Sequence, residues 1–291
     1  MERDRGVTPF DDRVCALGEG PMWHPLRKQL FWFDILGKKL LSQLDGASMS
    51  WTFDEMVSAA GWIDKNRLLI ASQTKLFAFD LNDGSQSDLV PLEADNPNTR
   101  SNDGRADPWG GFWIGTMDIE DHQPNGAFYR YYKGELRKLF GELTITNACC
   151  FSPCRRFAYF TDTEERIIKR VDLDPETGWP SAAPVDWLDL SGHDWGPDGA
   201  VIDADGNFWN AQWGAWRIAC YSPESTLLRT IDIDAAHTSC PAFGGADGTT
   251  LFCTTAAVGI GEEDAKKSEH HGKVFAAENI AKGQSEHQVI L

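Results

Sequence analysis

The sequence predicts an all-β fold, a six-bladed β-propeller whose four-stranded antiparallel blades surround a central channel. Three observations support this prediction. A strand motif recurs about every 45 residues, turn-forming residues flank each copy, and the 291 residues include 12 Trp and 16 Phe. Repeats of this length that contain only strands are typical of propellers, each repeat being one blade. We expect Trp and Phe side chains to fill the wedges between blades.

The repeat is clearest in a short apolar strand whose central residue serves as a marker. Turns rich in Gly, Pro, Asn or Asp precede most of these strands, as at 107–111 and 203–207. Another turn and another strand follow, such as Lys75–Asp80. The second unit has the weakest pattern, and the fourth strand of each blade is the least clear. The six markers, spaced 37 to 50 residues apart, are Trp32, Leu69, Trp113, Tyr159, Trp209 and Phe252.

The two ends of the repeat array have separate predictions. Residues 10–16, with the short run Arg13–Ala16, are expected to pair with the last blade and cover its exposed edge. Residues 1–9 are expected to form a loose tail, and one domain is expected to cover residues 1–291. The charged stretch 261–271 within the last blade is predicted to be a solvated loop, with a lid over a site as the alternative.

Composition excludes several classes of function. The formal charge of −17 would repel phosphate backbones and anionic membrane surfaces, so neither nucleic acid nor membrane is expected as a partner. The first residues lack the apolar core of a signal peptide, and we expect a cytoplasmic protein with no obligate protein partner. Seven Cys without a CxxC pair indicate reduced thiols that pack as small apolar groups, including the adjacent Cys149 and Cys150.

Four oxygen-bearing side chains occupy nearly the same phase of the repeat. Glu19, Asn102, Asn147 and Asp198 precede the markers of blades 1, 3, 4 and 5 by 11 to 13 residues. This phase corresponds to the loop just before the innermost strand, so all four are expected at the mouth of the channel. Blades 2 and 6 carry small or apolar residues there.

Two carboxylates and two amides form a set of hard oxygen ligands. Such a set suits Ca²⁺, Mg²⁺ or Mn²⁺, with Fe²⁺ and Zn²⁺ also compatible, and buried carboxylate charge favours a cation. We therefore expect one divalent metal ion as cofactor. The plainer interpretation is that Asn and Asp simply form turns. The segment Asp203–Asn207 superficially resembles a calcium loop, but a hairpin turn explains it fully.

Several short motifs, in order and spacing, resemble the SMP-30/gluconolactonase family, which includes regucalcin. The resemblance runs from about residue 14 to the end of the chain. One departure is Ala148, where the family often has glycine. The motifs are Leu17–Trp23, Asn98–Gly104, Gly115–Met117, Thr146–Asn147 and Pro197–Gly199.

The resemblance implies a six-bladed propeller that hydrolyses a sugar lactone, such as gluconolactone or xylonolactone, with a divalent metal ion. Glu19, Asn147 and Asp198 match the family's metal ligands, and Asp198 also matches its proposed general base. Arg100, Asn102 and Glu120 match its substrate-contacting positions.

Alternatives remain at three points. Asp103 or Glu120 could act as the base, because metal coordination lowers the basicity of a carboxylate. A calcium-binding propeller with a regulatory or docking role would need no catalysis. A third reading keeps the ring and the metal but changes the substrate to an organophosphate or an aryl ester.

Overall fold

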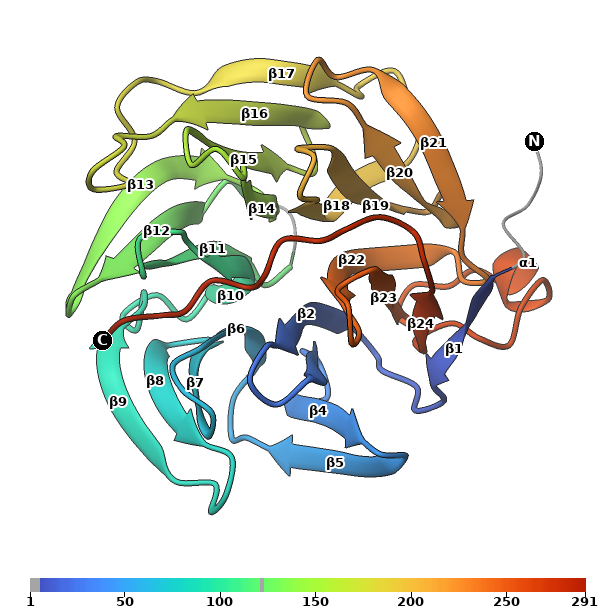
Figure 1. The fold of residues 1–291 in the computed structure, drawn as a ribbon, viewed down its shortest axis with the longest axis horizontal. Coiled ribbons are helices and arrows are strands. Elements are labelled where there is room, and N and C mark those ends of the chain that lie inside the picture. The colour runs from blue at the N-terminus through green and yellow to red at the C-terminus, as the bar shows by residue number, and fades with distance from the viewer. Residues whose placement is uncertain (1–5, 121–122) are drawn as a thin grey trace.

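Strands surround a common axis in the computed structural model, which describes residues 6–120 and 123–291 (Figure 1). Four sheets each contain four antiparallel strands in sequence order, which gives the chain a propeller-like arrangement. The first contains β2 Gly18–His24, β3 Gln29–Asp34, β4 Lys39–Leu44 and β5 Ala47–Thr52. The second contains β6 Val57–Trp62, β7 Arg67–Ser72, β8 Lys75–Asp80 and β9 Gln86–Pro91. The third contains β10 Thr99–Ala106, β11 Phe112–Asp118, β12 Gly126–Tyr132 and β13 Glu135–Leu143. The fourth contains β14 Thr146–Phe151, β15 Phe157–Asp162, β16 Ile167–Asp172 and β17 Val185–Asp189.

The remaining strands belong to one eight-stranded sheet. One half contains β18 Gly196–Ile202, β19 Phe208–Trp213, β20 Arg217–Tyr221 and β21 Leu227–Asp232. The other half contains β22 His237–Gly244, β23 Thr250–Ala256, β24 Val274–Ala277 and β1 Val7–Asp11. A single residue pair, Trp213 with His237, joins the halves through β19 and β22. The all-β, propeller-like prediction is confirmed, but the sheets number five rather than six separate blades.

The strand order within each sheet corrects one expectation from the sequence. The marker residues lie on the second strand of each unit, and the strands nearest the axis are β2, β6, β10, β14, β18 and β22 (Figure 1). Glu19, Asn102, Asn147 and Asp198 therefore lie within the first four residues of innermost strands, not in the loops before them. The second unit, which has the weakest sequence pattern, forms a complete four-stranded sheet.

Closure of the last sheet is confirmed, with a shift in the residues that achieve it. The closing strand β1 pairs antiparallel with β24, and Val7 lies opposite Ala277. The predicted run Arg13–Ala16 instead follows this strand, and the Cys15 amide donates to the carbonyl oxygen of Gly272. The strand begins within the expected N-terminal tail, of which residues 1–5 lie outside the described part of the chain.

Aromatic side chains fill the spaces between neighbouring sheets, as predicted. One apolar cluster combines Phe31 of β3 with Phe77 of β8, and another combines Trp113 of β11 with Phe160 of β15. The Trp113 and Phe151 rings meet edge to face with centroids 5.4 Å apart. These contacts bury the face that each sheet could not cover alone.

The charged stretch 261–271 forms a loop with a single helical turn, α1 Glu262–Ala265. His271 is built into this loop, because its Nδ1 accepts from the Ala236 amide and its Nε2 lies 3.1 Å from the carbonyl oxygen of Asp264. None of the helical structure in residues 6–120 and 123–291 is long and apolar enough to cross a membrane.

All seven cysteines are free, and six of them are buried. Burial raises the pKa of the Cys149 thiol well above its usual value, with nearby Asp103 adding to the effect. A high thiol pKa disfavours the reactive thiolate. The six buried cysteines, among them Cys149 and Cys150, therefore act as apolar packing groups, as the sequence predicts.

Candidate metal and substrate site

A cavity of about 590 Å³ lies at one end of the ring axis. Its floor contains Glu19, Arg100, Asn102, Asn147 and Asp198, which come from four different innermost strands. The rest of its lining is apolar at the mouth and charged on one side. Those residues include Leu36, Met56, Ile119, Val258, Trp213, Glu164, Arg166 and Asp194. The cavity is where the ring brings residues far apart in the sequence together.

A β-bulge shapes each of the strands that supply the floor. Glu19 pairs with Phe33 whereas Met22 pairs with Phe31, so three steps along β2 match two along β3. The same irregularity occurs beside Asn102, Asn147 and Asp198. A bulge adds one residue to a strand and re-aims the neighbouring side chains. The four residues recur at the same position of the sequence repeat because each lies at the same bulge of its unit.

Local sequence suits these bulges. Gly20 has φ of 53°, and a Cβ there would lie 2.2 Å from the carbonyl oxygen of Ser58, so glycine is required beside Glu19. Gly199, beside Asp198, lies so close to Cys240 that a Cβ would meet its Sγ at 2.3 Å. Ala148, which follows Asn147, adopts φ of 59°. This left-handed conformation costs about 1 kcal/mol for a residue other than glycine.

Hydrogen bonds fix the amide and guanidinium groups of the floor. Arg100 Nη1 donates to Asn102 Oδ1 at 2.8 Å, and Asn102 Nδ2 donates to Asn147 Oδ1 at 3.1 Å. Asn147 Nδ2 donates to Thr163 Oγ1, whose hydroxyl in turn donates to the carbonyl oxygen of Pro197. These bonds place the Asn147 amide oxygen on the side of Asn102 and its nitrogen on the side of Thr163. The oxygen keeps one lone pair that none of these bonds uses, and this lone pair is free to bind a cation. The chain of bonds links the third, fourth and fifth units.

Three buried carboxyl groups surround this chain. Burial raises the pKa of Glu19 to about 8, with the charge of Asp103 adding to it, whereas contact with the Asp198 side chain lowers it. Burial, together with the Glu19 charge, raises the pKa of Asp198 well above its usual value. Burial also raises the pKa of Asp103 to about 6, although the Cys149 amide donates to its Oδ2 at 2.7 Å. Burial and mutual repulsion favour the protonated forms of Glu19 and Asp198, and a nearby cation would favour their ionised forms.

The balance of charge suits a divalent cation. Arg100 and Arg105 supply two positive charges, and Glu286, in an ion pair with Arg105 at 2.5 Å, supplies a fourth carboxylate. When all four carboxyl groups are ionised, they and the two guanidinium groups carry a net charge of −2, which one divalent cation would neutralise. Within the described ranges no three His, Cys, Asp or Glu side chains form a metal site by themselves. Glu19, Asp198 and the amide oxygen of Asn147 together make the hard-ligand set that fits such an ion.

Five of the six residues singled out in the sequence line the cavity: Glu19, Arg100, Asn102, Asn147 and Asp198. Glu120 does not; it is exposed at the end of β11, and its amide donates to Asp118 Oδ1. The sequence argument missed Thr163, which orients Asn147, and the wall residue Trp213. The Trp213 ring stacks on His237 with centroids 4.1 Å apart, a contact between two strands that no local pattern reveals.

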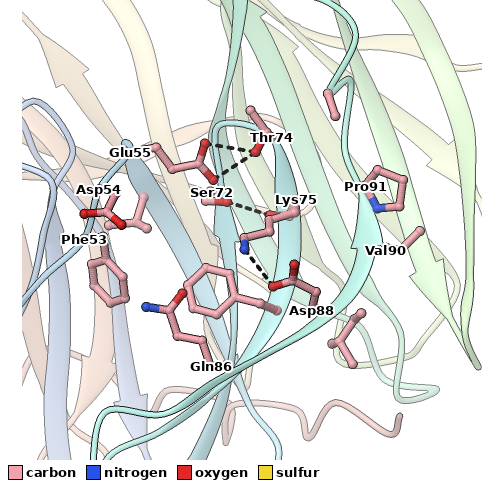
Figure 2. A pocket seen from close by; sticks show the side chains of 14 residues that line it. Phe53, Asp54, Glu55, Ser72, Thr74, Lys75, Gln86, Asp88, Val90 and Pro91 are labelled. Carbon is pink, nitrogen blue, oxygen red and sulfur yellow. Dashed lines mark hydrogen bonds and ion pairs between the residues drawn. The ribbon is translucent and has the colours of Figure 1, made fainter.

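A second cavity of similar volume is lined mainly by the second sheet and by residues 53–55, which connect it to the first sheet (Figure 2). Several of its polar groups are already paired with one another. Lys75 Nζ contacts Asp88 Oδ1 at 2.7 Å, and the Thr74 hydroxyl donates to the Glu55 carboxylate. It lacks the cluster of buried carboxyl groups found on the axis, so the axial cavity is the candidate site.

The raised pKa of Glu19 predicts how pH affects stability without metal. The folded protein holds the Glu19 proton more tightly than the unfolded chain, whose ordinary value is 4.5. The contribution to the free energy of unfolding is complete below that value and is lost as pH rises through about 8. Between about pH 6.5 and 8 we expect the Tm of chelator-treated protein to fall, and a divalent cation to offset the fall. A Tm that stays level or rises over this interval without metal would contradict the assignment.

Comparison with known proteins gives a consistent result. Residues 17–257 match the family model described as SMP-30/Gluconolactonase/LRE-like region. A putative sugar lactone lactonase of Rhizobium meliloti is 38% identical over 96% of this chain and 97% of its own length. L-arabinolactonase of Azospirillum brasilense is 33% identical over 96% of this chain and 94% of its own. The crystal structure of a calcium-binding protein, regucalcin, from Agrobacterium tumefaciens has 34% identity and a TM-score of 0.96, covering 99% of this chain and 98% of that one.

Proposed function

Because the chain belongs to the SMP-30/gluconolactonase/LRE-like family, we propose that it is a metal-dependent sugar lactonase that opens an aldonolactone to the aldonic acid. The observation that carries the proposal is the convergence of Glu19, Asn147 and Asp198 with Arg100 and Asn102 in one cavity. Relatives named sugar lactone lactonase, L-arabinolactonase and pentonolactonase support the substrate class. We also propose that the chain is one domain with six blades. The eight-stranded sheet then counts as two blades, because a single residue pair joins its halves.

Glu19, Asn147 and Asp198 would hold one divalent ion. A relative described as a calcium-binding protein supports calcium as one candidate. The ion, when bound, supplies Lewis-acid chemistry to the ester oxygens of the lactone. The remaining tasks of binding, orientation and proton transfer fall to side chains of this protein.

Arg100 and Asn102 grip the hydroxyl groups and orient the ring. Their hydrogen bond of 2.8 Å and the bond from Asn102 to Asn147 fix both groups before substrate arrives. Fixed donors and acceptors cost little reorganisation when a substrate binds, and they hold its carbonyl in a productive orientation. This polar floor favours polyhydroxylated lactones.

Asp198 takes a proton from the attacking water as general base. The water oxygen bonds to the carbonyl carbon, the bond from that carbon to the ring oxygen breaks, and the ring oxygen receives a proton. Two other carboxylates are less well placed for this role. Asp103 is not part of the cavity lining and already accepts from the Cys149 amide, and Glu120 lies outside the cavity.

One observation favours a second candidate, an ester or lactone with an apolar substituent. Leu36, Ile119 and Val258 line the mouth and remain 45%, 37% and 41% exposed, which is unusual for large apolar side chains on one rim. They would contact whatever part of the substrate lies farthest from the floor. An aryl ester or alkyl lactone would use this rim, whereas an aldonolactone would depend mainly on the floor.

A substrate panel distinguishes these functions. Acid release is followed in weak buffer with a pH indicator for D-glucono-1,5-lactone, L-arabinono-1,4-lactone, an alkyl lactone and phenyl acetate, each with and without EDTA. Reactions without protein correct for spontaneous opening. We expect the largest kcat/KM for an aldonolactone and loss of at least about a hundredfold with EDTA. Preference for phenyl acetate would favour the second candidate, and no metal-dependent hydrolysis across the panel would favour a non-catalytic calcium-binding propeller.

A further inference from the structure

The C-terminal segment 278–291 crosses the face of the ring after β24 (Figure 1), and its Ile290 amide donates to the carbonyl oxygen of Gly110 in the turn between β10 and β11. Its contacts fall at the far ends of the innermost strands, opposite the ends that carry the candidate site. Gln284 Nε2 donates to the carbonyl oxygens of Phe151 and Ile202, the last residues of β14 and β18. The Val289 amide donates to the carbonyl oxygen of Trp62, the last residue of β6. The segment therefore closes the end of the channel opposite the cavity.

One side chain of this segment reaches the interior. Glu286 Oε1 lies 2.5 Å from Arg105 Nη1, and the two side chains are only 9% and 11% exposed. The carbonyl oxygen of Glu286 also accepts from Trp62 Nε1, which fixes its backbone. In the described residues no hydrogen-bond partner exists for Arg105 Nε, so Glu286 is the main anchor of this guanidinium. A nearly buried ion pair of this kind is costly to break from one side.

Arg105 connects this pair to the site. It lies near the end of β10, the strand that also carries Asn102 and Asp103, and its charge lowers the pKa of Asp103 against the larger effect of burial. Asp103 Oδ2 accepts from the Cys149 amide, and Asp103 itself lies within the bulge of β10. Cys149 lies in the bulge that follows Asn147, and Gly104 ends the bulge that contains Asn102. The Asp103 carboxylate thus ties two site-forming bulges together.

We propose that Glu286 is a positioning residue for the candidate metal site: it holds Arg105, which leaves Asp103 bonded to the bulges that present Asn102 and Asn147. Without the Glu286 charge, Asp103 is the remaining acidic residue whose charge acts on Arg105, and Arg105 then competes with the Cys149 amide for the Asp103 carboxylate. The Asn147 bulge, in which Ala148 already adopts an unfavourable φ of 59°, then loses its anchor. The inference rests on the proposed function for the identity of the site. The link from Glu286 to the bulge rests on the ion pair with Arg105, on the place of Arg105 two residues after Asp103 in β10, and on the bond from the Cys149 amide to Asp103.

The test compares Glu286→Gln, which removes charge and keeps shape, with Glu278→Gln, the same change at an exposed position of the same segment. Calorimetry first identifies which of Ca²⁺, Mn²⁺ and Zn²⁺ binds the wild-type protein most tightly. That ion is then titrated into the metal-free form of each variant. Glu286→Gln is expected to weaken its binding about tenfold, and Glu278→Gln less than about twofold. Glu286→Asp should recover part of the loss because it restores the charge. Hydrogen exchange of peptides covering residues 146–151, in metal-free protein, should be faster only in Glu286→Gln.

The outcomes separate the two claims. If wild-type protein binds a divalent cation, and Glu286→Gln lowers Tm without changing either the Kd or the exchange of residues 146–151, the segment is only a structural clasp and the inference is wrong. If wild-type protein binds no divalent cation, the proposed function fails. The exchange experiment then still decides whether Glu286 positions the bulge, because it needs no metal.

Discussion

Replacement of Asp198 by Asn is expected to lower kcat on an aldonolactone by at least about a thousandfold, because the amide cannot take a proton from water. The amide oxygen can still serve as a ligand, so some affinity for the divalent ion remains. Loss of a buried carboxylate beside Glu19 should also raise the Tm of metal-free protein, since the charge is costly to bury. Steady-state kinetics at saturating cation, together with calorimetric metal titration, measure both effects.

Asp205→Asn is the matched control, because Asp205 is exposed in the turn between β18 and β19 and lies outside the cavity. Its kcat and Kd should stay within about twofold of wild type, as is usual for surface changes. Substantial turnover by Asp198→Asn at saturating cation would reject Asp198 as the base and return attention to Asp103.

Replacement of Glu19 by Gln is expected to weaken binding of the divalent ion by at least about a hundredfold, since it removes one of the two carboxylates in the ligand set. Activity should recover in part at high cation concentration, in contrast to Asp198→Asn, because Glu19 has no part in proton transfer. The fall of metal-free Tm between about pH 6.5 and 8 should become smaller, because Glu19 contributes to it together with Asp198. An unchanged Kd would show that the ion, if one binds, binds elsewhere.

Much of the fold follows from local sequence. Strand periodicity and turn chemistry define the repeat, and the aromatic positions such as Trp113 become the packing between sheets. The eight-stranded sheet is harder to predict, because the pair that joins its halves, Trp213 with His237, depends on how two distant strands approach. The closing strand is expected from the sequence, but its register is not. Pairing of Val7 with Ala277 depends on a partner 270 residues away.

The floor of the site is predictable for a related reason. A repeated bulge produces a repeated phase, so Glu19, Asn102, Asn147 and Asp198 can be recognised without knowing that a bulge is present. Glu120 shows the limit of this reasoning, because it follows the innermost pair of strands and its position depends on the loop after β11. The Glu286 contact to Arg105 carries no local signal, since it joins residues separated by 181 positions.

The most direct test of the account is a titration of metal-free protein with a divalent cation while acid release from D-glucono-1,5-lactone is recorded. The account predicts that the rate, corrected for spontaneous opening, rises in proportion to bound ion and levels off at one ion per chain. It also predicts that Glu19→Gln moves the whole curve to higher cation concentration. Full activity without bound ion, or one tightly bound ion with no hydrolysis of any aldonolactone, would contradict it.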